Sequence, residues 1–194
     1  MRLTSIAILA LFAGHATLAQ VTGNPAGLSP DTPGVESATP APDHANAQDL
    51  LFVRQASLGN RAEVELGKMA QSKGSEAAVK EFAQRMQKEH AQSLERLTKA
   101  GRATKVELPK DLDAEHKRVR DELGKLSAAE FDKAYLATQI EAHQRTANLL
   151  LWHLSYGQNA GLLRYSADTL PVVLDHLDHA KRDYAARTST PVSP

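Results

Sequence analysis

The chain has 194 residues, of which 42% are hydrophobic and 24% are charged, the balance of an ordinary globular domain with appendages. Lysine and arginine together number 23, as do aspartate and glutamate, so the chain lacks the net positive charge that attracts nucleic acid. It contains no cysteine, which excludes disulfides, cysteine-based zinc sites, thiol catalysis and lipid attachment at an N-terminal cysteine.

The first 19 residues have the pattern of a secretory signal peptide. Arg2 is followed by an apolar run from Ile6 to Ala13 and then by small residues, and cleavage after Ala16 or Ala19 fits this order. The apolar run is too short for a membrane-spanning helix, which needs about 20 apolar residues. We therefore predict export to the periplasm or beyond the cell, with no transmembrane segment in the mature chain. An association with the outer membrane stays open.

Two stretches on either side of the main domain have compositions that cannot bury a core. Residues 20–47 are dense in proline, glycine, serine and threonine, which predicts a flexible spacer. Residues 187–194 have the same character and are predicted to form a loose tail. Between them, residues 48–186 carry four long helical patterns and a short one, with no strand pattern and no internal repeat. We therefore predict one folded domain over 48–186.

The first two long patterns cover about 48–71 and 76–100. Asn46 precedes the first as its cap, with Asp49 three residues further on, and Ser75 is predicted to cap the second. Inward-facing positions recur every three or four residues, as in a helix packed in a bundle. They are Phe52, Ala56, Gly59, Glu63, Leu66 and Ala70 in the first helix and Val79, Ala83, Met86, His90, Leu94 and Leu97 in the second.

A connection with a short, highly charged helical pattern at about 111–123 leads to the second pair of long helices. The third helix is predicted to begin at a capping box of Ser127 and Glu130. The fourth, about 159–186, contains Pro171, which is predicted to kink it around Ala167. Their inward positions are Phe131, Tyr135, Gln139, Ala142 or His143, Thr146 and Leu150, followed by Leu162, Ser166, Thr169, Val173, His176 and Ala180. Two helical hairpins joined by a longer link predict an all-α four-helix bundle with a short extra helix between helices 2 and 3.

Each inward stripe is interrupted by one conspicuous polar residue: Glu63, His90, His143 and His176. A buried carboxylate must be paired, protonated or bound to a cation, and imidazoles are common neutral metal ligands. The rise of a helix places His143 and His176 within roughly 4.5 Å of the same depth, but Glu63 and His90 only within roughly 10 Å. Two interpretations stay open, a hydrogen-bonded polar layer or a site for one transition-metal ion.

Other polar residues are weaker candidates for chemistry. Glu89 points about a quarter turn away from His90 and is expected to be solvated. His153 is expected to pack at the end of its helix, whereas Asp132 and Tyr135 are placed to hydrogen-bond across the bundle. Serine-nucleophile motifs, phosphate-binding loops and dinucleotide fingerprints are absent from the sequence, which disfavours an enzyme.

A set of dispersed residues resembles a known bacterial family. The set includes Phe52-Val53, Ala62 to Ala70, Met86 to His90, Phe131-Asp132, Tyr135-Leu136, His143, Leu170-Pro171 and His176-Leu177. It is similar to the domain-of-unknown-function 4142 family, often described as predicted exported or outer-membrane proteins. The resemblance covers about Asp49 to Tyr184 and implies a ferritin-like four-helix bundle and export, but no activity. Ferritin-like di-iron proteins use Glu-x-x-His motifs, whereas Gln87 and Val173 stand at those glutamate positions here, which disfavours ferroxidase or oxygenase chemistry.

The sequence favours a non-enzymatic exported bundle with a structural, stress-related or interaction role in the cell envelope. Its partner would be another envelope protein or a second copy of the chain, and not nucleic acid. The alternative is a protein that binds one zinc, copper or iron ion through Glu63, His90, His143 and His176.

Overall fold

The four long helical patterns form four long helices in the computed structural model, which describes residues 44–188. The helices are α1 (Ala47–Lys73), α2 (Ala77–Ala100), α4 (Ala128–Tyr156) and α5 (Ala160–Thr188). The link between α2 and α4 contains a 3-10 turn, η1 (Gly101–Thr104), and the short helix α3 (Ala114–Gly124). The predicted all-α, ferritin-like four-helix bundle with an extra helix between its second and third long helices is confirmed. The predicted signal peptide, most of the spacer and residues 189–194 of the tail lie outside the described residues.

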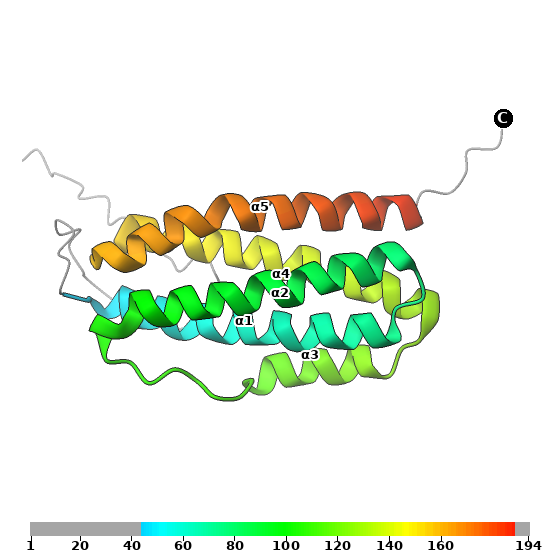
Figure 1. Cartoon of the computed structure of the whole chain (residues 1–194), viewed down its shortest axis with the longest axis horizontal. Coiled ribbons are helices and arrows are strands. Elements are labelled where there is room, and N and C mark those ends of the chain that lie inside the picture. The colour runs from blue at the N-terminus through cyan, green and yellow to red at the C-terminus, as the bar shows by residue number, and fades with distance from the viewer. Residues whose placement is uncertain (1–43, 189–194) are drawn as a thin grey trace, which may run out of the picture.

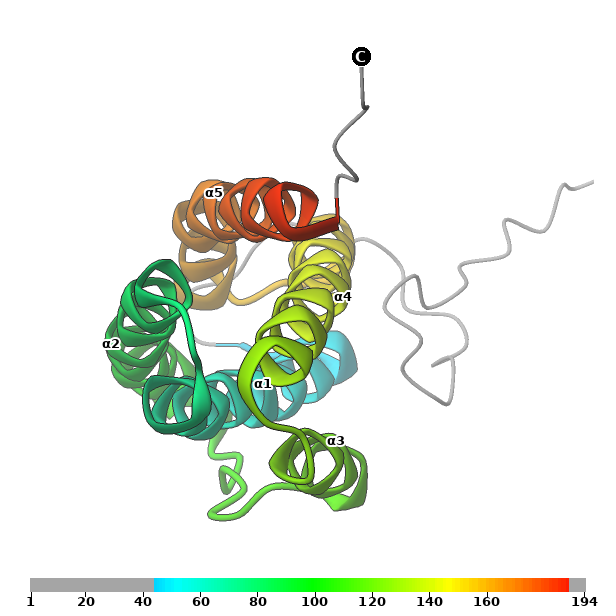
Figure 2. The same cartoon turned by 90° about the vertical axis from the view of Figure 1, so that its right-hand side faces the viewer.

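The bundle is built from two antiparallel hairpins that lie side by side. α1 packs along α2 and α4 packs along α5, and the hairpins meet through α1 with α4 and α2 with α5 (Figure 1). Seen along the bundle, the four helices surround a common interior, while α3 lies outside it next to α1 (Figure 2). Within residues 44–188, no helix is both long enough and apolar enough to cross a membrane.

The interior consists of two apolar clusters with a polar layer between them. One cluster is centred on Phe52, Leu97, Leu150 and Leu162, and the other on Phe82, Met86, Phe131 and Leu136. Along α2, α4 and α5, a histidine separates the residues of one cluster from those of the other. Because apolar packing fixes the helices on both sides of this layer, the histidine side chains are held at one level of the bundle.

The helix ends show which predicted caps form. Asn46 and Asp49 exchange side-chain to backbone hydrogen bonds of 2.8 Å at the start of α1, which confirms the predicted cap. Ser75, predicted to cap α2, does not accept a bond there. Instead Asp132 of α4 accepts hydrogen bonds from the backbone N–H groups of Ser75 and Glu76 and from the Ser75 hydroxyl. A carboxylate from another helix therefore satisfies this helix N-terminus, which favours negative charge.

The predictions for α4 and α5 have different outcomes. The capping box of Ser127 and Glu130 is wrong, because the Ser127 side chain accepts no hydrogen bond at the start of α4. The backbone of Ala128 has φ of 50°, a left-handed conformation that turns the first helical residue away from the geometry a cap requires. α5 continues through Pro171, and its N-terminal part is inclined to the rest (Figure 1).

Candidate metal centre

The three predicted histidines meet in the interior of the bundle. His90 of α2, His143 of α4 and His176 of α5 are 7%, 1% and 1% exposed. The Nε2 atom of His143 lies 3.4 Å from Nε2 of His90 and 3.3 Å from Nδ1 of His176. One nitrogen from each ring lies within 4.8 Å of the other two. His143 therefore takes the inward position for which Ala142 was the alternative.

The outer nitrogen of each ring has a hydrogen-bond partner that can only accept. His143 Nδ1 lies 2.9 Å from the backbone carbonyl oxygen of Gln139, and His176 Nε2 lies 2.7 Å from a carboxylate oxygen of Glu89. Both outer nitrogens must therefore carry the hydrogen and donate it. In a neutral imidazole this leaves the inner nitrogen with an unprotonated lone pair.

The same conclusion holds for His90, whose outer Nδ1 lies 3.0 Å from Oδ1 of Asn60. The orientation of the Asn60 amide follows from its other bond, because its Nδ2 group donates to the backbone carbonyl of Ala56 at 2.7 Å. The flipped amide would place two acceptor oxygens against each other. His90 thus donates through Nδ1, and its Nε2 lone pair points inward.

Three lone pairs consequently converge on one buried point. Without a cation between them these atoms repel one another. A tetrahedral zinc ion with Zn–N bonds of about 2.05 Å separates its nitrogen ligands by about 3.3 Å. The two shortest separations, 3.4 and 3.3 Å, match this spacing. Metal-bound histidines characteristically donate their other N–H to a carboxylate or carbonyl, as these three do to a carboxylate, a carbonyl and an amide oxygen.

Burial favours the neutral rings that metal binding requires. It lowers the pKa of His176 to about 4, against which the hydrogen bond to Glu89 acts only in part. Burial, together with the charges of His143 and His176, also holds the pKa of His90 well below its ordinary value. At neutral pH, His90 and His176 therefore do not favour a second proton that could take the place of a metal cation.

The two glutamates near the cluster do not take the positions expected from the sequence. Glu63 is buried but is not among the ligand atoms that converge, and it accepts a hydrogen bond of 2.7 Å from Gln139. Glu89 was expected to be solvated, yet it bonds His176 and accepts a hydrogen bond from Arg85. Burial would raise the pKa of Glu89, but the bonds from Arg85 and His176 outweigh it and lower that pKa. Glu89 therefore faces His176 as an anion.

Two openings border the cluster. The first, which we call the α1/α4 cavity, has a volume of about 240 Å³ and includes His90 and Glu63 in its wall. The second, the α2/α5 groove, has a volume of about 230 Å³ and is lined by His90, Glu89 and His176. The groove touches two of the three convergent rings, so a metal ion and a fourth ligand from solvent have a route to the site.

A fourth buried histidine, His153, forms a separate polar chain near one end of the bundle. His153 contacts Asp49 at 2.8 Å through Nε2 and Ser166 at 2.8 Å through Nδ1, and all three residues are fully buried. Asp49 also accepts the backbone N–H groups of Gln158 and Asn159. This resembles a catalytic serine–histidine–aspartate arrangement in composition, but the Ser166 hydroxyl is fully buried and hydrogen-bonded to His153. It ties the α4–α5 turn to the start of α1.

The fold and the site together define an antiparallel, ferritin-like four-helix bundle with a layer of convergent histidines inside it. The chain belongs to the family described as Domain of unknown function (DUF4142), whose model matches residues 34–182. The structure is similar to the crystal structure of a DUF305 fragment from Deinococcus radiodurans, with a TM-score of 0.65 and 13% sequence identity over 73% of this chain and 98% of that one. At this identity the likeness shows the fold alone. No match was found among curated proteins.

Proposed function

We propose that this protein binds one transition-metal ion, zinc or copper, through His90 Nε2, His143 Nε2 and His176 Nδ1. The observation that carries the proposal is the convergence of three unprotonated ring nitrogens. The hydrogen of each ring lies on its outer nitrogen, because an oxygen that accepts hydrogen bonds faces that nitrogen. Imidazole suits both metals, and two of the three separations between the nitrogens match those around a tetrahedral ion. The signal-peptide pattern at the N-terminus supports a role outside the cytoplasm, where the protein would meet its metal in the cell envelope.

The set of three histidine ligands favours a site for a single metal ion with one position open to solvent. Three protein ligands leave the fourth position of a tetrahedral ion to water or another small ligand, which can enter from the α2/α5 groove. No carboxylate joins the convergent nitrogens in the described part of the chain, so the bridging ligands of a di-iron centre are not supplied there. A mononuclear metal-binding role therefore fits better than ferritin-like iron oxidation.

Elemental mass spectrometry on the protein purified from the periplasm without an affinity tag tests the proposal. We expect close to one zinc or copper ion per chain, and loss of that metal in His143→Ala. The matched control is His179→Ala, which removes a half-buried histidine from the same helix as His176 without touching the cluster. A metal-free protein whose melting temperature does not respond to added zinc or copper would refute the proposal. The histidines would then form only a hydrogen-bonded polar layer in an envelope protein.

A further inference from the structure

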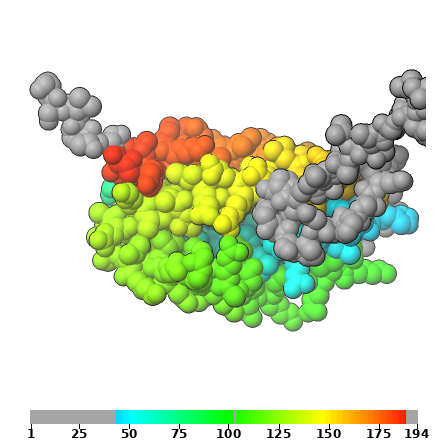
Figure 3. Space-filling model, turned by 180° about the vertical axis from the view of Figure 1, so that it is seen from behind, coloured from blue at the N-terminus to red at the C-terminus, as the bar shows by residue number. Residues whose placement is uncertain are grey.

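The α1/α4 cavity exists because small residues face each other across the bundle. α1 contributes Ala56, Gly59 and Ala62 to its wall, and α4 contributes Ala142. A Cβ atom added at Gly59 would meet no other atom within 4 Å. In the space-filling view from behind, a strip of α1 is visible in the furrow between α4 and α3 (Figure 3). Larger side chains at these positions would close the space, so the hollow follows directly from the sequence.

The size and lining of the cavity suit a small organic molecule. At about 240 Å³ it exceeds the roughly 150 Å³ of a cavity that holds benzene. Leu66, Val119, Leu149 and Val173 supply apolar wall. Ligand sites in proteins are typically concave, mostly apolar and provided with a few polar groups, which is the composition found here.

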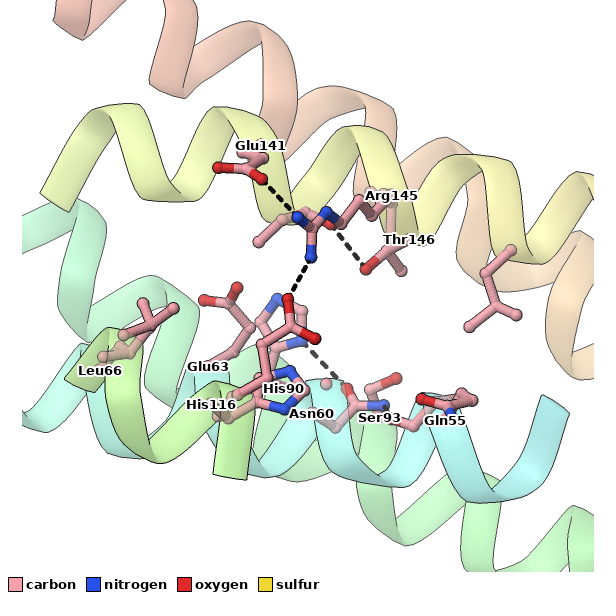
Figure 4. A pocket seen from close by; sticks show the side chains of 18 of the residues that line it. Gln55, Asn60, Glu63, Leu66, His90, Ser93, His116, Glu141, Arg145 and Thr146 are labelled. Atoms are coloured by element: carbon pink, nitrogen blue, oxygen red, sulfur yellow. Dashed lines mark hydrogen bonds and ion pairs between the residues drawn. The ribbon is translucent and has the colours of Figure 1, made fainter. Parts of the chain in front are cut away.

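Two polar side chains in the wall are available to a ligand. The hydroxyl of Thr169 is buried, with the residue only 6% exposed, and it makes no hydrogen bond within the described region. Such an unpaired polar atom is costly unless water or a ligand satisfies it. Glu63, also buried, accepts a single hydrogen bond, from Gln139, among the described residues. Its side chain and that of His90 both line the cavity (Figure 4).

The charges around the cavity disfavour an anionic ligand. Four carboxylates line it, those of Glu63, Asp113, Glu115 and Glu141, against two guanidinium groups. Arg145 is already engaged by Glu115 and Glu141 at the mouth (Figure 4), and Arg118 is engaged by Glu122. No unpaired cation within the described wall therefore awaits a carboxylate or phosphate. An entering ligand meets an acceptor, Glu63, that favours a hydrogen-bond donor.

We propose that the α1/α4 cavity binds a small, largely apolar organic molecule without negative charge, which donates a hydrogen bond to Glu63. The apolar body of the ligand packs between the small residues of α1 and α4. This site shares His90 with the metal site as part of its wall, but the ligand contacts proposed here involve Glu63 and the small residues and not the three converging nitrogens, so the proposal goes beyond metal binding.

Isothermal titration with three matched probes tests this site: 2-phenylethanol, 2-phenylethylamine and phenylacetate. We expect the alcohol and the amine to bind with dissociation constants below about 1 mM, within the range of ligand efficiencies for molecules of this size. Phenylacetate should bind at least tenfold more weakly. Glu63→Gln should reduce that discrimination to about twofold or less, because it removes the charge and keeps the shape.

Cavity-filling variants locate the binding. Gly59→Leu should abolish it, and Gly59→Ala, which adds one methyl group, should retain it. Ala142→Leu blocks the space from the opposite wall and serves if Gly59→Leu does not fold. Absence of saturable binding of any probe, tighter binding of phenylacetate, or binding unaffected by both leucine variants would overturn the inference. Metal content measured on the same samples separates failure of this site from failure of the metal site.

Discussion

Glu89→Gln tests whether the hydrogen bond between Glu89 and His176 strengthens metal binding by His176. Glu89 accepts the outer N–H of His176 at 2.7 Å as an anion, which increases the electron density of the ring and fixes its orientation. Loss of such a partner typically lowers metal affinity by about 10- to 100-fold. The Glu89 side chain is 32% exposed, so solvent already screens part of the interaction, and we expect the lower end of this range. The expected loss is about tenfold, or about 1.4 kcal/mol.

Competition for zinc against a fluorescent chelator at pH 7 measures this effect. Glu81→Gln is the matched control, because it makes the same charge change at an exposed position of the same helix. The control should leave the zinc affinity within about twofold of that of the original protein, because salt screens the effect of a distant, exposed charge on the metal. Equal affinities of Glu89→Gln and the unchanged protein would refute the role of Glu89 in orienting His176. Equal losses of zinc affinity in both variants would show that the loss comes from the change in overall charge and not from the contact with His176.

Three further predictions concern the stability of the fold. In the metal-free protein, the free energy of unfolding should fall as pH drops from 6.5 toward 4, because burial lowers the pKa of His176 to about 4 and the unfolded chain binds the proton more readily. The part of this loss that His176 contributes approaches about 3 kcal/mol. Urea denaturation at several pH values checks it, because His176→Gln should weaken the pH dependence while His90, whose pKa burial also lowers, keeps its own contribution. Asp49→Asn should cost about 3 kcal/mol at pH 7, since it removes the charge that accepts from His153 and three backbone amides; equal stability in thermal melts would contradict this. Gly59→Ala should stabilise the protein by about 0.5 to 1 kcal/mol, because its methyl group enters open space. Gly67→Ala should destabilise it by about 2 kcal/mol, because its Cβ would lie 2.8 Å from the backbone oxygen of Ala83, and opposite signs in urea denaturation distinguish the two glycines.

The histidine layer could be predicted because helical periodicity identifies residues that share a face. His90, His143 and His176 fall on the inward stripes, and the depth estimate brought His143 and His176 close together. The same estimate left Glu63 and His90 poorly matched, and the structure leaves Glu63 outside the convergent ligand atoms. Helix rise thus predicted the meeting of His143 and His176, but it did not show that His90 joins them while Glu63 stays outside.

The residues that support the cluster could not be found in this way. Glu89 lies a quarter turn from the inward stripe, and its contact with His176 depends on how α2 and α5 approach each other along their flanks. Asn60 depends in the same manner on α1 lying against α2. The cap of α2 by Asp132 joins residues 57 positions apart, so the sequence around Ser75 contains no pattern that predicts it. Contacts between flanks of neighbouring helices are set by the rotation of each helix about its axis, which periodicity leaves undefined.

The sequence by itself determined the number of helices, their order, the inward stripes and the absence of cysteine chemistry. These properties depend on interactions between residues a few positions apart, which are encoded locally. The tertiary structure decided which nitrogen of each histidine points inward, because that choice follows from acceptors on other turns and other helices. It also decided that the small residues of α1 and α4 face each other and leave a cavity, since a void arises only where two surfaces fail to fill the space between them.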